Sequence, residues 1–367
     1  MKFAFITTTI NKPIFLEDYL KNFKSQKKFY VEFFVIGDRK TPKNVLNYLN
    51  NLQKKYNHTI NYFDFKKTQN FLKKNKSIFK IFPKDNAVRK YIGNILAYQK
   101  NFDVIMMVDD DNFLNDKNYL NFASTAHTNN KKKIKSIKSS TKWFNIYKSL
   151  EENKNLKFYP RGFPWSKRFK TEKVSIKQRY LKTCFINGLV LEDPDIDAIT
   201  RLYHPIKVTK FNSKKFGHQY SLEPGTWSSF NNQNSIIPSD VVPLHFTPPS
   251  AGRNSDIWAS FFMCKLAECL NERIVFGSPL VTQLRNKHDL WDDLNLEFQN
   301  NYLTDYFVNL LRSLKIASTN KTLIASIICN KSLKKLKSDK TKLKIKDYNY
   351  IKNFFEEYLI WINYFKN

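Results

Sequence analysis

Three consecutive aspartates, Asp109, Asp110 and Asp111, are the residues whose types and spacing point most directly to chemistry. Adjacent carboxylates repel one another, which raises the pKa of at least one of them unless a cation lies nearby. A hard divalent cation such as Mg²⁺ or Mn²⁺ prefers oxygen ligands and shares them with a diphosphate. Side chains alternate along extended backbone, so Asp109 and Asp111 can hold one metal ion. Asp110 then points elsewhere, with a ribose hydroxyl as one candidate partner. The competing interpretation is a solvated acidic turn.

The segment before the aspartates favours a binding site. Val104–Val108 is wholly apolar and predicts a buried strand that ends at the acidic cluster. Ligands of open α/β sheets bind at the carboxyl ends of strands. Phe3–Ile10 and Tyr30–Gly37 predict two more buried strands, with polar residues at their ends. These residues either contact a nucleotide or serve strand propensity and turn formation: Thr7, Thr8 and Asp38.

Helical segments alternate with these strands. Pro13–Phe23, Val45–Tyr56 and Asp85–Gln99 have helical spacing of apolar residues, and Ile60–Phe65 predicts another strand. The alternation predicts an α/β, Rossmann-type, mostly parallel sheet with helices on both faces. We expect Asp85 to cap its helix. Arg89, four residues later, either pairs with Asp85 or contacts the nucleotide.

The composition sets broad limits. The 367 residues include 62 Lys+Arg and 32 Asp+Glu, a formal net charge of +30 that favours anionic partners. The abundance of Lys, Asn and Ile also fits an AT-rich coding bias, and no nucleic-acid-binding module is recognisable, so we expect no nucleic-acid partner. None of the four cysteines forms a CxxC pair and no apolar run approaches the ~20 residues of a membrane span. We expect a reducing, cytoplasmic location, with the first apolar segment a strand and not a signal peptide.

The later part of the chain divides into three kinds of segment. Residues 129–142 are rich in Lys and Ser and predict a mobile loop or exposed helix. Phe158–Gly252 is rich in Pro, Gly and aromatic residues, which predicts short, irregular strands. Asp256–Leu270 and the region from Leu303 onward have helical spacing, the latter interrupted by a basic stretch, Lys331–Lys346.

The predicted domains follow from these segments. We expect a catalytic domain over 1–300, with a nucleotide-binding half at 1–115 and a sugar or acceptor half at 155–300. A C-terminal helical extension then covers 301–367. Tyr348–Phe365 reads as an amphipathic helix with three open roles: docking on the catalytic domain, a contact between two copies of the chain, or peripheral contact with an anionic membrane at its cytoplasmic face.

Several segments, in one consistent order, resemble the reversibly glycosylated polypeptide family, which includes the plant UDP-arabinopyranose mutases. YPRGFPWS with a following arginine is similar to that family's YPRG(Y/F)PFSxR signature. The resemblance covers about Phe3 to Pro279, with departures at Asn112 and Ser255. The segments that carry it are Lys84–Arg89 with Gly93, Asp109–Phe113, Tyr159–Ser166 with Arg168, Gly188–Leu191, Pro194–Ala198, Gly252–Arg253 and Asp256–Ala259.

The resemblance implies a GT-A-like fold, a UDP-sugar donor and a divalent metal, Mn²⁺ or Mg²⁺, at Asp109 and Asp111. It associates Arg161 with reversible self-glycosylation. A guanidinium is a poor nucleophile, so a clamp on the diphosphate is the more natural role. A lone histidine, such as His245 or His288, is more often structural than a ligand. The resemblance and the position of each residue give these candidates: Arg161, Arg168 and Asp256 as catalytic, and Thr7, Thr8, Asp38, Asp85, Arg89, Asp110, Gly188, Asp195 and Asp197 as substrate-binding.

Three functions stay open at this point. The first is a metal-dependent glycosyltransferase that moves a sugar from a UDP-sugar to a glycan or lipid-linked acceptor, in surface-glycan synthesis. The second is a mutase that interconverts the pyranose and furanose forms of a UDP-sugar. The third is a non-catalytic, self-glycosylating protein that binds sugar nucleotides. A homo-oligomer is compatible with all three.

Overall fold

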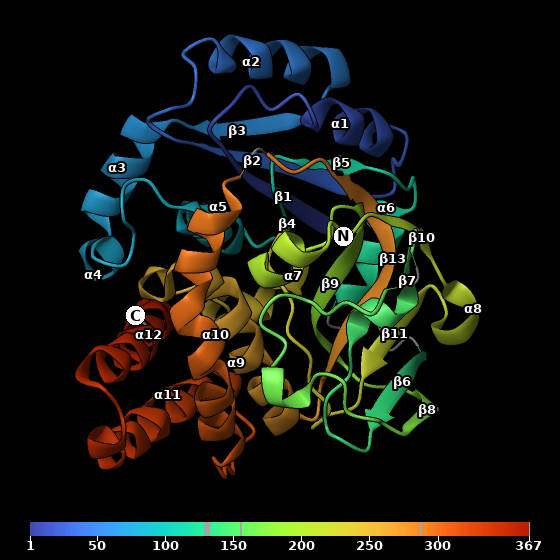
Figure 1. The fold of residues 1–367 in the computed structure, drawn as a ribbon. Coiled ribbons are helices and arrows are strands. Elements are labelled where there is room, and N and C mark those ends of the chain that lie inside the picture. The colour runs from blue at the N-terminus through green and yellow to red at the C-terminus, as the bar shows by residue number, and fades with distance from the viewer. Residues whose placement is uncertain (128–132, 155, 287, 367) are drawn as a thin grey trace.

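Four parallel strands form the N-terminal half of the sheet in this computed structural model, which describes residues 1–127, 133–154, 156–286 and 288–366 (Figure 1). They are ordered β3-β2-β1-β4 and connected by helices on both sides. Their bounds are β1 (Lys2–Thr9), β2 (Tyr30–Gly37), β3 (Thr59–Phe63) and β4 (Val104–Val108). The helices are α1 (Leu16–Lys24), α2 (Val45–Tyr56), α3 (Phe65–Lys74), α4 (Lys76–Phe79) and α5 (Lys90–Gln99).

Alternating side chains of these strands fill two separate apolar layers. Phe3 and Phe5 of β1 belong to the layer that holds α1 and α2. Ala4 and Ile6 of the same strand belong to the layer that holds α5. A strand whose successive residues are all apolar must be covered on both faces, because its side chains point to opposite sides. The predicted α/β class, with helices on both faces, is confirmed.

The second half of the sheet mixes strand directions. β12 (Asn234–Pro238) lies antiparallel between β4 and β9 (Thr183–Glu192), and β13 (Arg273–Gln283) runs parallel to β9. Shorter strands extend this edge: β11 (Gln219–Leu222), β6 (Ile134–Ser139), β8 (Val174–Arg179), β5 (Asn112–Leu114), β7 (Leu150–Glu152) and β10 (Val208–Phe211). Short helices lie between them: α6 (Tyr119–Ala123), α7 (Ala198–Tyr203) and α8 (Ser213–Phe216).

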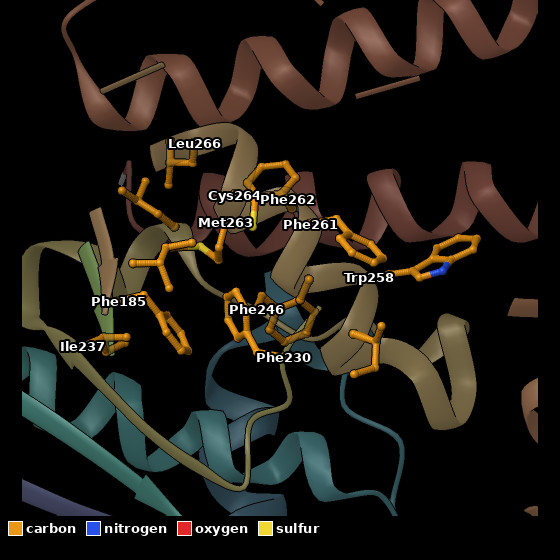
Figure 2. Packing of buried hydrophobic residues seen from close by; sticks show 14 of the residues in the cluster. Phe185, Phe230, Ile237, Phe246, Trp258, Phe261, Phe262, Met263, Cys264 and Leu266 are labelled. Atoms are coloured by element: carbon orange, nitrogen blue, oxygen red, sulfur yellow. The ribbon is translucent and has the colours of Figure 1, made fainter. Parts of the chain in front are cut away.

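The C-terminal helices pack on α9 (Ser255–Leu270). α10 (Leu290–Arg312), α11 (Lys321–Ser338) and α12 (Ile345–Tyr364) enclose it together with the sheet. Aromatic side chains of α9, among them Trp258 and Phe262, point into this core (Figure 2). Trp258 stacks on Phe307 with ring centres 4.1 Å apart, and Phe262 stacks on Tyr358 at 4.0 Å. Three roles were open for the segment Tyr348–Phe365. The packing of α12 corresponds to the first of them, docking on the rest of the chain. In the described residues no helix is long and apolar enough to span a membrane.

Several local predictions need correction. The loop or helix expected over 129–142 contains strand β6, while residues 128–132 lie outside the described part. β9 has ten residues, longer than the short strands expected there. The basic stretch breaks the helical pattern less than expected, because α11 continues to Ser338. The expected boundary at residue 300 falls inside α10, which begins at Leu290.

Candidate active site

The three aspartates occupy a turn that is tied to neighbouring strands by backbone hydrogen bonds. The Asp109 N–H donates to the carbonyl of Gln233 at 2.9 Å, and the Asn112 N–H donates back to the carbonyl of Asp109 at 3.2 Å. The Leu284 N–H donates to the carbonyl of Asp111 at 2.9 Å. The acidic turn is therefore fixed between the residues that precede β12 and those that follow β13.

Two cavities open beside this turn. Asp109 and Asp111 both line a cleft of about 600 Å³. Asp110 lines a smaller pocket of about 240 Å³. The segment Asp85–Ala87 lines both, so the two cavities adjoin there. Asp109 and Asp111 thus line one cavity and Asp110 the other, although these residues lie in a turn and not on the extended backbone that was expected.

An ion pair forms one wall of the smaller pocket. Arg89 donates to the Asp38 carboxylate, and both side chains are buried. Arg89 Nη1 also donates to the Lys84 carbonyl at 3.0 Å, and burial lowers the pKa of Arg89. On the opposite side, Thr9 Oγ1 donates to Asp110 Oδ2 at 2.8 Å. Burial, followed by the charge of Asp109, raises the pKa of Asp110 even though the hydrogen bond from Thr9 opposes that rise.

The cap predicted at Asp85 is wrong. Asn86 caps the short 3₁₀ segment Ala87–Arg89 instead, because its side chain accepts the Val88 N–H at 2.9 Å. Asp85 pairs with Arg39 at the surface. The alternative of an Asp85–Arg89 surface pair also fails, since the partner of Arg89 is the buried Asp38. Asp85 nevertheless lines both cavities.

Arg161 lies at the base of the larger cleft with its guanidinium enclosed by acceptors. Nε donates to Asp195 at 2.9 and 3.0 Å, and Nη2 donates to Asp256 at 3.2 Å. Nη1 donates to the Arg253 carbonyl at 2.7 Å and to Asn254 Oδ1 at 2.5 Å. The diphosphate clamp expected for Arg161 does not fit this geometry, because every nitrogen of the guanidinium already donates to a protein acceptor. Arg161 instead positions Asp256 at the cleft wall.

The two carboxylates on Arg161 differ in electrostatics. Burial alone would raise the pKa of Asp195, but the charges of Arg161 and Arg285 outweigh it and hold the pKa below its ordinary value. Burial raises the pKa of Asp256, and Arg161 offsets only part of that effect. Burial alone would lower the pKa of Arg161, yet Asp195 and Asp256 keep it well above its usual range. Asp195 is therefore a fixed anion of the wall, while Asp256 is more easily protonated.

Cations other than Arg161 also line the cleft. Lys90 donates to Asp109. Arg285 Nε donates to Asp193 at 3.0 Å, and Arg253 donates to Asp293 and Glu297, each at 2.9 Å. Positive and negative side chains both line this cavity, which suits a ligand that carries both phosphate oxygens and hydroxyls.

The acidic turn supplies two oxygen-donor side chains to the cleft. Burial, followed by the charge of Asp109, raises the pKa of Asp111 to about 6. Gln283 Nε2 donates to Asp111 Oδ2 at 3.2 Å. Among the described residues no group of three or more His, Cys, Asp or Glu side chains is arranged to hold a metal ion. Two carboxylates that face one cleft still fit Mg²⁺ or Mn²⁺, because such ions take their remaining ligands from water and substrate phosphates.

Four predicted site residues line neither cavity. Arg168 Nη2 donates to Asp197 at 2.7 Å in a buried pair, and its guanidinium lies 3.8 Å from the ring centre of Trp165. Asp197 also caps α7 by accepting the Thr200 N–H. Thr7 is fully buried within β1.

The fourth of these residues, Gly188, serves strand packing. A Cβ added at Gly188 would lie 2.2 Å from Nδ2 of Asn234 on the adjacent strand β12. A larger residue at position 188 would therefore require the Asn234 side chain to move. The structure thus places Thr7, Arg168, Gly188 and Asp197 outside the two cavities that hold the other predicted site residues.

The two weighed histidines have different positions. His245 is buried, and its ring lies 3.3 Å from the Tyr91 hydroxyl. Burial, with the charge of Lys90, lowers its pKa to about 3, so it stays neutral. His288 lines the larger cleft, with Nδ1 3.5 Å from Asp293. The structural interpretation holds for His245, while His288 joins the cleft wall.

Sequence reasoning missed several side chains of the cleft. Lys90 directly follows Arg89, and nothing in the sequence distinguishes it from the many other lysines. Arg285 lies just after the end of β13. The aspartates were selected because they follow a predicted strand, and the same reasoning would select Arg285 if β13 had been predicted. The others lie in irregular segments with no motif of their own: Asn232, Gln233, Arg253 and Gln283.

No family model and no curated protein matches this chain. Among solved structures, it is similar to glucosyl-3-phosphoglycerate synthase from Mycobacterium tuberculosis in complex with Mn²⁺, UDP and phosphoglyceric acid, at 6% identity and a TM-score of 0.41 over 86% of this chain and 80% of that one. It is also similar to the mannosyltransferase PcManGT from Pyrobaculum calidifontis in complex with GDP-Man and Mn²⁺ (8% identity, TM-score 0.42, 98% and 85% coverage). S. aureus TarS 1–349 is 12% identical at a TM-score of 0.38, with 99% and 81% coverage.

Proposed function

We propose that this chain is a nucleotide-sugar glycosyltransferase that uses a UDP-sugar donor and a divalent metal. The smaller pocket takes the nucleoside, the junction at Asp85–Ala87 takes the diphosphate, and the larger cleft takes the sugar and the acceptor. The observation that supports this most is the division of the acidic turn. Asp110 lines one cavity, while Asp109 and Asp111 line the other.

The polar groups of the smaller pocket suit a nucleoside. Asp38 and Asp110 offer carboxylate oxygens to ribose hydroxyls or to a base N–H, and Thr8 and Thr9 add backbone and hydroxyl groups. The Arg89–Asp38 pair fixes one of these carboxylates in orientation. A charge-assisted hydrogen bond of this kind holds the carboxylate oxygens in a fixed direction.

Asp109 and Asp111 would hold Mn²⁺ or Mg²⁺. When bound, such an ion neutralises the diphosphate as it departs from the sugar. Lys90 adds positive charge from the chain itself on the same side of the cleft. A cation held in place before the reaction stabilises developing negative charge without the cost of reorienting solvent.

Asp256 is the carboxylate placed to accept a proton or a hydrogen bond from a sugar or acceptor hydroxyl. It lines the larger cleft at the start of α9, and Arg161 fixes its position. Its raised pKa suits proton exchange near neutral pH better than an unperturbed carboxylate does. Covalent attachment of a sugar to Arg161 is disfavoured, because it would require breaking the hydrogen bonds of a buried guanidinium.

The experiment is to incubate purified protein with Mn²⁺, a panel of UDP-sugars and candidate acceptors, and to follow products by NMR and intact mass. We expect slow UDP release that accelerates with an acceptor, and loss of that release in Asp111→Asn. Isomers of different ring size would instead establish the mutase, and a mass gain at Arg161 without turnover would establish self-glycosylation. If no UDP-sugar binds, the proposal is wrong.

A further inference from the structure

Lys90 places an ammonium group where a metal ion would approach Asp109. It is the first residue of α5 and its side chain is buried, whereas the side chain of Asp109 is 40% exposed to the cleft. Lys90 Nζ donates to Asp109 Oδ1 and lies 3.3 Å from the Asn232 carbonyl. Both Lys90 and Asp109 line the larger cleft. The buried Lys90 ammonium therefore contacts an Asp109 carboxylate that is still accessible from the cleft.

The surroundings restrict where this ammonium can go. Asn232 is itself buried, and its N–H is oriented to Asp256 Oδ2 at 3.4 Å, so the carbonyl that receives Lys90 belongs to a fixed segment. An ammonium has three donors. Two are directed to Asp109 and Asn232, which leaves one for a ligand in the cleft, since no further acceptor is recorded for Lys90 among the described residues.

Among the described residues, Asp111 has no cation within hydrogen-bonding distance. Its side-chain donors are the uncharged amides of Gln283 and Asn112, and the charge of Arg285 acts on it only from farther away. The two carboxylates that face the cleft are therefore unequal: Asp109 accepts a hydrogen bond from a cation of the chain, and Asp111 accepts hydrogen bonds from neutral groups. A divalent ion that binds both must share Asp109 with Lys90 or displace it, because two cations on one carboxylate repel each other.

We infer that Lys90 is a built-in cation of the donor site that competes with the divalent metal for Asp109 and gives nucleotide binding a component that needs no metal. With metal absent, the ammonium holds Asp109 and directs its remaining donor toward a phosphate oxygen. With metal present, Lys90 yields Asp109 and keeps its charge beside the same phosphate. The contact between Lys90 and a nucleotide phosphate, which is the second half of this inference, rests on the proposed function. The competition for Asp109 does not.

The first experiment measures metal affinity without nucleotide. Mn²⁺ is titrated into the full chain, and the electron paramagnetic resonance signal of free Mn²⁺ gives the bound fraction. We expect Lys90→Met to bind Mn²⁺ at least tenfold more tightly than the unmodified protein. Lys90→Arg should keep the original affinity. The matched control is Lys100→Met, which removes the same charge from a pair with Glu32 elsewhere.

A double-mutant cycle locates the effect. Asp109→Asn removes the carboxylate for which the two cations compete, so adding Lys90→Met to it should give no further gain in Mn²⁺ affinity. Circular dichroism and a thermal melt establish that each variant is folded. The competition is overturned if Lys90→Met leaves Mn²⁺ affinity unchanged or weakens it, or if the gain persists in the Asp109→Asn background.

The second experiment measures UDP affinity by calorimetry with EDTA present. The unmodified protein should bind UDP without metal, and Lys90→Met should bind it at least tenfold more weakly. Added Mn²⁺ should restore Lys90→Met by a larger factor than it improves the unmodified protein. Equal metal-free affinities, or no metal-free binding by the unmodified protein, would overturn the second half. If no variant binds UDP even with Mn²⁺, the proposed function fails, and the Mn²⁺ titration still decides the competition.

Discussion

Arg161 Nε lies 2.9 Å from Asp195 Oδ1, and the same guanidinium reaches Asp256 on α9. One buried cation therefore links the segment before α7 to the start of α9, where Asp256 lines the cleft. Removing one partner of a buried ion pair leaves an uncompensated charge, which typically costs about 3 kcal/mol or more.

Arg161→Met should lower the free energy of unfolding by about 3 kcal/mol, because Asp195 and Asp256 would lose their shared counter-ion. Urea unfolding followed by tryptophan fluorescence measures this change. Lys207→Met is the control, since both side chains of its pair with Glu192 are exposed and loss of that pair should leave the midpoint unchanged. Equal midpoints for the two variants would contradict the structural role assigned to Arg161.

Asp111→Asn should stabilise the metal-free protein at neutral pH. The folded protein raises the pKa of this carboxyl from its ordinary 3.8 to about 6, so the folded state binds the proton more tightly than the unfolded chain does. Stability that this group contributes is fully present below about pH 4 and is lost as the pH rises through about 6. The variant should gain about 3 kcal/mol at pH 7 and nothing below about pH 4.

Thermal melts of both proteins at pH 3.5, 5 and 7 in EDTA check this dependence. The same substitution should weaken Mn²⁺ binding at pH 7 at least tenfold, so gain of stability and loss of metal affinity would occur together. A stability difference that is the same at every pH would rule out burial of the charged carboxylate as its cause.

Ala87→Trp should block nucleotide binding without destabilising the fold. Ala87 is exposed and lines both cavities where they adjoin, so an indole there would fill the junction. Calorimetry with UDP and Mn²⁺ should show at least a tenfold loss of affinity, with an unchanged melting temperature. Ala317→Trp, at an exposed loop position, is the control. Unaltered UDP affinity in Ala87→Trp would mean that the two cavities do not share one ligand.

Tyr350→Phe should weaken the support of a segment that lines the cleft. The Tyr350 hydroxyl of α12 lies 2.7 Å from the Ala251 carbonyl and 2.8 Å from Asn300 Oδ1. Its loss should cost about 1 kcal/mol of stability. We also expect a higher KM for the sugar donor, because Ala251 belongs to the segment Pro249–Asn254 that carries Arg253. Tyr348→Phe on the same helix is the control, and steady-state kinetics beside a thermal melt separates the two effects.

Several strands and helices of the N-terminal part could be predicted because their patterns are local, whereas α3 and α4 were not predicted and α5 begins five residues later than expected. β2, α2 and β4 have the bounds that apolar periodicity gives. Asp109 and Asp111 could be selected for the same reason, since a strand end and a side-chain alternation are both visible in the sequence. The placement of Asp110 in a different cavity from Asp109 and Asp111 could not be predicted. It depends on where the fold places the neighbouring segment Asp85–Ala87.

The residues that escaped prediction depend on distant partners. Arg168 has the same chemistry as Arg161 and a similar motif position, yet Asp197 and Trp165 retain it in the core. Lys90 can be recognised as a residue of the cleft only from its contact with Asp109, nineteen positions later in the chain. No local pattern distinguishes a buried structural arginine from one at a cleft, because the difference lies in which acceptors the fold brings near.

The docking of α12 has a consequence for how the protein is made. Trp361 Nε1 donates to the Val242 carbonyl, Tyr358 donates to the Leu244 carbonyl, and Glu357 accepts the Ser250 N–H. These contacts support the segment that carries Arg253, and residues 345–364 leave the ribosome after every residue of the cleft. A nascent chain can therefore complete its sheet before α12 supports the cleft. The arrangement of the segment Pro249–Asn254 then depends on a helix that is synthesised after it.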